Sequence, residues 1–409
     1  MAGKNLTYKR KIIRQLYFSG LLSCAEVAQQ IEKSLSLVAK ILNELIADGI
    51  VIETGHAPSS GGRRPQMYSL KKDVLYIVSV AMDQYFTRIG IMDMHNNYVL
   101  PAEEYEIRLV DNPKALSHLA EIIENKITAS GISREQIAGI GIGMPGFVDP
   151  QQGVNYTFLP SGSSSITGYI SEKTGVPTYI ENDSGIISLA ELRFGAARNC
   201  KNAMVINVGW GVGLGMILDG ALFRGDNGFA GEFSHIPLFD NGKLCSCGKS
   251  GCLETETSLF IIVEKALEGI RAGRVTVLKQ LLSGKEADLE KDAEAVIESA
   301  RKGDRFAIEL LSEAGYNIGR GIAILIHLLN PRIVVLSGRG ALAGKIWEAP
   351  IQQALNEHCI PRLAANTEIS ISTLGYEAEL IGSGALVMEQ FGEQGKLALK
   401  AKKPVKVAS

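Results

Sequence analysis

Hydrophobic and polar positions in the first seventy residues follow the pattern of three helices. Residues 9–18 carry their large apolar side chains on one helical face. Ser23, with Glu26 three residues later, forms a capping box that predicts a short second helix over 24–30. A third apolar stripe predicts a helix over 34–48, followed by a glycine that favours its end.

The residues after these helices predict a β-wing. The segments 50–54 and 66–70 read as strands, and the stretch 57–65 between them is a basic, glycine-containing turn. Three-helix units without a DNA function are common, but the basic wing favours a winged helix-turn-helix whose third helix enters the major groove. The residues expected to contact DNA are Ser34, Ser36, Leu37, Lys40, Arg63 and Arg64.

From residue 72 onward the pattern changes to alternating buried strands and amphipathic helices. The predicted strands are 75–83, 87–94, 137–149, 177–183, 203–211, 213–220, 330–338 and 367–374. The predicted helices cover 113–129 and 184–197, and residues 258–329 are mainly helical. This order predicts an α/β fold in two related lobes.

Composition and charge narrow the class of protein. Of 409 residues, 46% are hydrophobic and 21% charged, which is typical of a globular protein, and no apolar run is long enough for a membrane span. The basic N-terminus is not followed by the apolar segment of a signal peptide, so a cytoplasmic location is expected. Residues 1–70 hold nine Lys or Arg against five acids, a net charge of +4 in a chain of net charge −2. A basic head on an acidic body suits a nucleic-acid-binding module, although a solvated helix surface has the same signature.

The chain has six cysteines, three of them clustered. The scattered ones, Cys24, Cys200 and Cys359, are expected to be free thiols. The clustered ones lie between residues 245 and 252 and need another explanation.

The segment 228–254, GFAGEFSHIPLFDNGKLCSCGKSGCLE, together with Asn182 and Asp183, resembles the ROK family of repressors and sugar kinases. It matches the family pattern Gly-Glu-x-x-His followed by Cys-x-Cys-Gly-x-x-Gly-Cys-x-Glu. The basic winged domain favours the repressor branch. The resemblance implies a two-lobed, actin-like (ribonuclease H-like) sugar-kinase fold after the winged helix-turn-helix. The expected domains are 1–70 for DNA binding, 71–182 for the first lobe with helix 378–391 returning to it, 183–377 for the second lobe, and a disordered Lys-rich tail over 392–409.

Four residues in that segment have the chemistry of a metal site. His235, Cys245, Cys247 and Cys252 are ligand types that zinc takes in closed tetrahedral sites, so a structural zinc is expected. The alternative is a coincidental trio of reduced cysteines.

The resemblance also implies a sugar site. Asn182, Asp183, Glu232 and Glu254 match positions that hold sugar hydroxyls in the family, and His235 matches the metal ligand that borders the pocket. In the kinases the residue matching Asp183 is the general base, so here it marks the position of a vestigial base. The alternative role for Asp183 is a helix N-cap.

The phosphate-binding pattern of the kinases is broken. Their Asp-x-Gly-Gly-Thr motif matches residues 81–85 here, where neither the acid nor the glycines remain in place: these residues are Ala81, Met82, Asp83, Gln84 and Tyr85. Trp210 replaces a small hydroxyl residue in the second loop, and Arg339 stands between the glycines of the third. Because phosphoryl transfer depends on such loops, no enzymatic activity is expected.

A serine-rich stretch replaces another conserved piece of the kinases. Ser161, Ser163, Ser164 and Ser165 either accommodate a larger or phosphorylated sugar or form a flexible surface loop.

The sequence thus predicts a DNA-binding regulator, of the repressor type, for carbohydrate-metabolism genes. Its partners would be operator DNA and a sugar or sugar-phosphate effector, and it would act as a homodimer or homotetramer. No membrane partner is expected. Two alternatives stay open: an active ATP-dependent sugar kinase with a DNA-binding appendage, and a regulator that responds to a protein partner.

Overall fold

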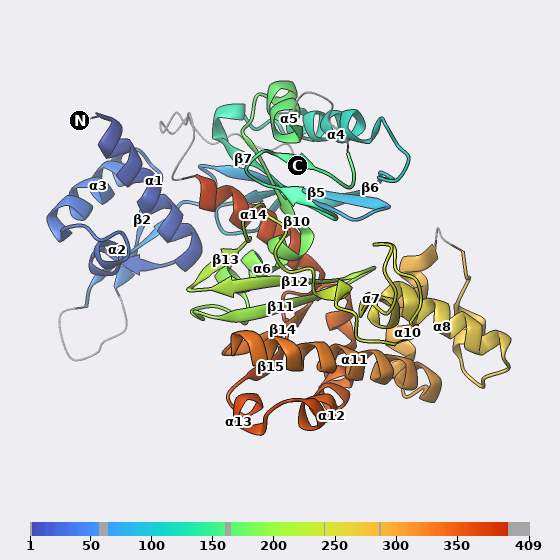
Figure 1. Cartoon of the computed structure of the whole chain (residues 1–409). Coiled ribbons are helices and arrows are strands. Elements are labelled where there is room, and N and C mark those ends of the chain that lie inside the picture. Colours follow the sequence, from blue (N-terminus) through green and yellow to red (C-terminus); the bar gives the residue numbers. More distant parts are fainter. Residues whose placement is uncertain (1, 57–63, 160–164, 241, 286–287, 392–409) are drawn as a thin grey trace. The chain divides into compact units, whose positions relative to one another are not determined.

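A computed structural model describes residues 2–56, 64–159, 165–240, 242–285 and 288–391 (Figure 1). The chain divides into two compact units. Unit 1 contains Met1–Ile186 and the C-terminal segment from Glu379, and unit 2 contains Ile187–Ala378. Arg63, expected at the wing tip, and the expected disordered tail lie outside the described residues.

Unit 1 begins with the three helices and the wing that the sequence predicts. The elements are α1 (Ala2–Ser19), β1 (Leu22–Ser23), α2 (Cys24–Gln30), α3 (Leu35–Ala47), β2 (Val51–His56) and β3 (Gln66–Leu70). The three strands form a sheet in the order β1-β3-β2. The capping box is confirmed, since the Ser23 hydroxyl accepts from the Glu26 amide and the Glu26 carboxylate accepts from the Ser23 amide.

The rest of unit 1 is built on a five-stranded sheet in the order β10-β7-β4-β5-β6. Its strands are β4 (Tyr76–Met82), β5 (Phe86–Asp93), β6 (Tyr98–Glu106), β7 (Ile137–Met144) and β10 (Thr178–Asn182). β4, β7 and β10 are parallel, whereas β5 runs antiparallel to both β4 and β6. The remaining elements are β8 (Val148–Asp149), β9 (Val154–Asn155), α4 (Ala115–Ser130), α5 (Ile166–Thr174) and α14 (Ala378–Gln390).

Unit 2 repeats this topology with the sheet β13-β12-β11-β14-β15. Its strands are β11 (Ala203–Val208), β12 (Val212–Leu218), β13 (Ala221–Phe223), β14 (Ile333–Ser337) and β15 (Glu368–Ile371). In each sheet an antiparallel meander of three strands is followed by two parallel strands that lie on its other side. This repeated order confirms the predicted actin-like, ribonuclease H-like fold.

Several helices of unit 2 share one apolar core with one face of the second sheet. Between β13 and β15 the chain forms α7 (Glu254–Thr257), α8 (Leu259–Arg271), α9 (Leu278–Leu281), α10 (Leu289–Arg301), α11 (Arg305–Leu329), α12 (Glu348–His358) and α13 (Pro361–Ala364). Helix α6 (Asp183–Phe194) contains the division between the units, because its first turn belongs to unit 1.

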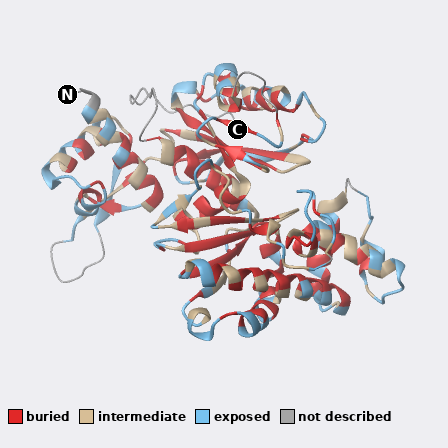
Figure 2. Ribbon diagram, viewed as in Figure 1, coloured by how far each residue is buried: buried red, intermediate tan, exposed pale blue. Residues whose placement is uncertain are grey.

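Both sheets are covered by apolar cores. Strands β7, β11 and β14 are buried along their whole length, and Figure 2 shows the central strands of both sheets in the colour of buried residues. Such continuous apolar runs are expected for strands covered on both faces. The largest fully buried side chain is Trp347, whose indole N–H donates to the Gly340 carbonyl at 2.7 Å.

The sequence did not predict every element. The edge strand β6 was not expected, because its residues are mostly exposed and carry no apolar run. Helix α5 was likewise not expected. The predicted domain limits remain a prediction. In the described part of the chain, no helix combines the length and the hydrophobicity that crossing a bilayer requires.

Candidate metal and sugar site

The four predicted metal ligands meet in unit 2. His235 ends a short 3₁₀ helix, η2 (Phe233–His235), and the three cysteines follow in the loop before α7. One ligand atom from each of His235, Cys245, Cys247 and Cys252 lies within 4.8 Å of all the others. A group of this size and composition matches the Cys₃His shell of a structural zinc site.

Short backbone pairings shape the cysteine loop. Pro237 pairs with Cys252 and Leu244 with Ser250 in isolated antiparallel bridges. Gly251 adopts φ +78°, and a Cβ there would lie 2.0 Å from the Phe239 carbonyl oxygen. Only glycine fits this position, so the loop sequence is matched to a tight fold around the cysteines.

Burial and hydrogen bonding shift the pKa values of two of these thiols. Burial, followed by hydrogen bonds with the other two cysteines, raises the pKa of Cys252 to about 12. The pKa of the exposed Cys247 is lowered, mainly by a backbone hydrogen bond at Lys249. Three thiolates this close would repel one another without a cation, and a divalent metal reverses that preference.

Two predicted sugar-binding carboxylates adjoin the metal group. Oε2 of Glu232 lies 3.7 Å from Nε2 of His235, whose Nδ1 lies 3.5 Å from the Cys245 sulfur. Burial raises the pKa of Glu232, with a smaller contribution from the neighbouring carboxylate of Glu254. Glu254 begins α7, and a Cβ on Gly211 would lie 2.7 Å from its Oε2. The structure therefore brings Glu232, His235 and Glu254 together.

Asn182 and Asp183 lie at the end of β10 and the start of α6, in unit 1. The Asn182 side-chain oxygen accepts from the backbone N–H of Ser184, at 3.0 Å, and of Gly185. Its amide donates to the Gly146 carbonyl at 3.1 Å. Asn182 thus provides the N-cap of α6, and the alternative that Asp183 is the cap is wrong because Asp183 is already the first helical residue.

In unit 1, the loop that matches the first phosphate-binding loop of the kinases is held by hydrogen bonds to one of its own side chains, Asp83. The Asp83 carboxylate accepts from the backbone N–H groups of Tyr85, at 2.8 Å, and Phe86, at 2.7 Å. This acid therefore stabilises the β4–β5 turn, a role that the sequence did not suggest.

In unit 2 the guanidinium of Arg339, in the third of these loops, packs against Trp210 of the second loop. It lies 4.9 Å from the ring centre of Trp210 and 4.8 Å from that of Tyr376. It also pairs with the Glu290 carboxylate at 2.8 Å and donates to the Tyr376 hydroxyl at 2.7 Å. Trp210, Arg339 and Tyr376 together form an aromatic clamp. Sequence reasoning singled out Trp210 and Arg339 but not Tyr376 or Glu290, which are distant in the chain.

The glycines retained in these loops have a packing role. A Cβ on Gly338 would lie 2.1 Å from the Asn207 side-chain oxygen, and one on Gly340 would lie 2.5 Å from a methyl of Val208. These glycines let the turn after β14 pack against the end of β11. Their retention is therefore explained without a bound phosphate.

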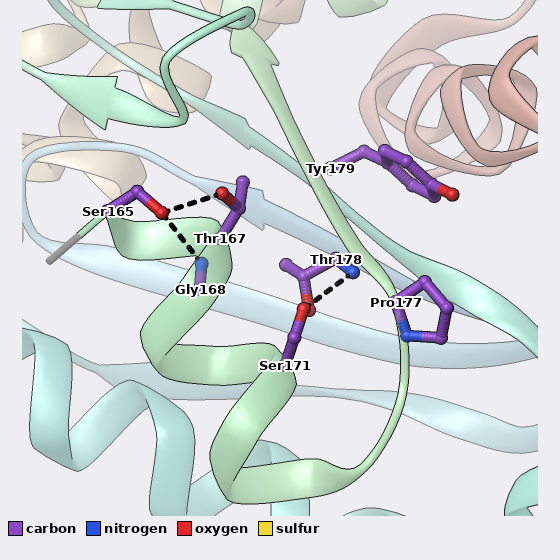
Figure 3. Close-up of a pocket in the computed structure, with 7 residues that line it drawn as sticks. All are labelled: Ser165, Thr167, Gly168, Ser171, Pro177, Thr178 and Tyr179. Carbon is purple, nitrogen blue, oxygen red and sulfur yellow. Dashed lines mark hydrogen bonds between the residues drawn. The ribbon is translucent and has the colours of Figure 1, made fainter. Parts of the chain in front are cut away.

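A surface hollow of about 330 Å³ lies between α5 and β10 (Figure 3). Its lining residues are Ser165, Thr167, Gly168, Ser171, Pro177, Thr178 and Tyr179. Ser165 caps α5 by accepting from the Gly168 amide at 2.9 Å, and Ser171 accepts from the Thr178 amide at 3.0 Å. Both hydroxyls therefore form hydrogen bonds within the protein, and none of the predicted sugar-binding residues lines the hollow. The other three serines of the predicted loop lie outside the described residues.

The predicted DNA-contacting residues that the structure describes face solvent or are half-buried. Ser34, Ser36, Lys40 and Arg64 are exposed, and Leu37 is half-buried. Leu35, in the first turn of α3, is 56% exposed although it is apolar, and the sequence analysis did not single it out. An apolar side chain at this place outside the core stripe suits a contact with a thymine methyl group.

Comparisons with known proteins agree with this geometry. Residues 98–390 match the model of the ROK family. The xylose repressor of Caldicellulosiruptor bescii is 27% identical over 93% of this chain and 95% of its own length. The glucokinase of Halalkalibacterium halodurans is 33% identical over 67% of this chain and 83% of its own. A crystal structure of a ROK family transcriptional regulator, a homologue of the E. coli MLC protein, superposes with a TM-score of 0.76 at 24% identity over 94% of this chain and 97% of its own. The chain belongs to the ROK family.

Proposed function

We propose that the chain is a sugar-responsive, DNA-binding transcriptional regulator of the repressor type. The observation that carries the proposal is the junction of a winged helix-turn-helix with a ROK body in one chain. The matched glucokinase leaves a third of this chain uncovered, whereas the matched xylose repressor covers nearly all of it. The pattern supports regulation of carbohydrate genes through an operator.

The effector is a sugar or sugar phosphate held by carboxylates. Within unit 2, Glu232 and Glu254 present acceptors beside the His235 ring. Contacts from Asn182 and Asp183 of unit 1 are what the family resemblance implies. Carboxylates bind vicinal hydroxyls through strong, charge-assisted hydrogen bonds. A site built to pair with hydroxyls discriminates strongly against analogues that lack them.

The metal site holds one structural zinc. His235, Cys245, Cys247 and Cys252 would fill all four positions of a tetrahedral shell, so the metal would have no open position for catalysis. Its role is to fold the loop that carries Glu232 and Glu254 on either side of the cysteines.

The body has no kinase activity in this proposal. The Asp83 carboxylate accepts hydrogen bonds from the backbone of the β4–β5 turn. In the third loop, Arg339 stands between the two glycines, and its guanidinium is paired with Glu290 and packed on Trp210. The match to a glucokinase favours the alternative of an active kinase, so the absence of turnover requires its own test.

The DNA contacts come from α3 and the wing. Ser34, Ser36, Leu37 and Lys40 face the major groove, and Arg63 and Arg64 approach the backbone or minor groove. One such module reads only a short half-site, so a homodimer or homotetramer reads a palindrome.

Two measurements on the full chain test the proposal. Selection of duplexes from a randomised library by the wild-type protein should enrich a palindrome with half-sites one or two helical turns apart. A thermal-shift panel of aldopentoses, aldohexoses, N-acetylhexosamines and their 6-phosphates should reveal a stabilising ligand, since about 100 times Kd adds roughly 2.7 kcal/mol. Failure to enrich any sequence contradicts DNA binding, and a flat panel contradicts the sugar effector.

A further inference from the structure

Three consecutive small residues in α14 contact three different parts of unit 1. A Cβ on Gly382 would lie 2.1 Å from the carbonyl oxygen of Ile186, in the first turn of α6. The Ser383 hydroxyl donates to the Val80 carbonyl on β4 at 2.9 Å. A Cβ on Gly384 would lie 3.0 Å from the hydroxyl oxygen of Tyr17, on α1. Because the glycines carry no side chains, the backbone of α14 itself touches both α6 and the DNA-binding module.

The central sheet packs directly against α14. Arg88 on β5 pairs with Glu379, in the first turn of α14, at 2.8 Å. A Cβ on Gly141 would lie 2.1 Å from the Ser383 carbonyl, so β7 also lies directly against this helix. Close-packed backbone contacts of this kind transmit strain from one element to its neighbours.

A hydrogen bond completes the contact with the DNA-binding module. The Tyr17 hydroxyl donates to the Asn96 side-chain oxygen at 2.5 Å. Asn96 lies in the β5–β6 turn with φ +60°, and its backbone N–H donates to the Asp93 carbonyl at 3.1 Å. Burial raises the pKa of Tyr17, so its phenol stays protonated and remains a donor.

The same turn also holds the end of the wing. A ring nitrogen of His95 lies 2.8 Å from the carbonyl oxygen of Leu70, the last residue of β3. The Asp93 carboxylate accepts from the His95 amide at 2.8 Å and thereby fixes the turn. Both α1 and the wing therefore contact the same β5–β6 turn.

Resting on the proposed function, we infer that the contacts of Ile186 with Gly382, and of Gly384 with Tyr17 and Asn96, couple the sugar site to the DNA-binding module. The route begins at Asp183, one turn before Ile186 in α6. A sugar that favours one position of the α6 N-terminus would shift α14, and α14 would reorient α1 through Tyr17. Coupling of this kind is set by the difference in sugar affinity between the two arrangements.

The Tyr17→Phe substitution tests this route, because it removes one hydroxyl and leaves the ring. The probes are the library-selected duplex and the most stabilising sugar of the thermal-shift panel. We expect an unchanged sugar Kd, and a ratio of DNA Kd values with and without sugar that falls from at least fivefold in the wild type to less than twofold. Asn96→Ala should have the same effect, and the double variant should add nothing, since the two residues share one interaction. Gly384→Ala should also reduce the ratio, by crowding the phenol.

Tyr105→Phe is the matched control, because it removes a tyrosine hydroxyl that hydrogen-bonds Glu103 on β6, away from α14. It should retain the wild-type ratio. A sugar-responsive wild type together with an equally responsive Tyr17→Phe variant overturns the inference alone. A wild type whose DNA affinity ignores every sugar removes the proposed function and the inference with it.

Discussion

The imidazole of His235 lies 3.7 Å from the Glu232 carboxylate through Nε2. The opposite nitrogen of this ring faces the sulfur of Cys245. A histidine that binds a metal through one nitrogen and contacts a carboxylate through the other is held in one orientation. In the proposed function, His235 therefore binds the metal and borders the sugar site. Loss of the metal should weaken sugar binding.

Purified wild-type protein should contain about one equivalent of zinc per chain. Cys247→Ser removes one ligand, so it should release the metal, lower the melting temperature and weaken sugar binding, because metal binding and local folding are linked. Elemental analysis and thermal unfolding measure both effects. Cys24→Ser is the control, since Cys24 lies in the DNA-binding module, and it should keep its zinc. Wild-type protein free of any thiolate-bound metal would contradict this prediction.

Glu232→Gln should weaken sugar binding by at least about tenfold, because a neutral amide replaces a charged acceptor and hydrogen bonds to charged groups contribute about 1.5–3 kcal/mol. The affinity for DNA without sugar should not change. Titration calorimetry with the stabilising sugar measures the first effect. The control is Glu264→Gln, a surface residue of α8 that pairs with Lys243. Normal sugar affinity in Glu232→Gln would exclude this carboxylate from the site.

Incubation with ATP, magnesium and the sugar panel should yield no sugar phosphate. Arg339→Ala removes the aromatic clamp but leaves the closed Asp83 turn, so it should not create activity. Mass spectrometry of the sugars provides the measurement. Sugar phosphate that forms with wild-type protein and disappears with Asp183→Asn would replace the regulator by the kinase alternative.

The sequence predicted which four side chains gather at the candidate metal site, because their spacing in the chain is short. Cys245, Cys247 and Cys252 lie within one loop, and His235 is close in the chain. The capping box at Ser23 was predicted for the same reason, since its two residues interact within one turn.

The sequence could not predict contacts between residues that lie far apart in the chain. Tyr376 and Glu290 surround Arg339 although each lies far from it in the chain. Tyr17 reads as an ordinary core residue of its helix, and nothing in the pattern indicates its hydrogen bond to Asn96. Asp183 was considered as a helix cap because a helix starts there, but the capping geometry belongs to the preceding Asn182.

Arg64→Ala should weaken DNA binding and make the negative slope of log K against log salt less steep by about 0.9, the contribution of one phosphate contact. Sugar affinity should stay unchanged. Filter binding over a salt series measures the slope. Arg305→Ala, which removes an exposed arginine of unit 2, should leave the slope as in the wild type. An unaltered slope in Arg64→Ala would remove the wing from the DNA contacts.

The most direct test of the regulator is the affinity of wild-type protein for its selected duplex, measured by fluorescence anisotropy at fixed salt with and without the stabilising sugar. A regulator with coupled sites should show a change in Kd of at least fivefold, within the usual range of allosteric coupling. The change should disappear in Glu254→Gln while its sugar-free Kd stays at the wild-type value. Equal wild-type Kd values with and without saturating sugar would contradict a sugar-responsive regulator.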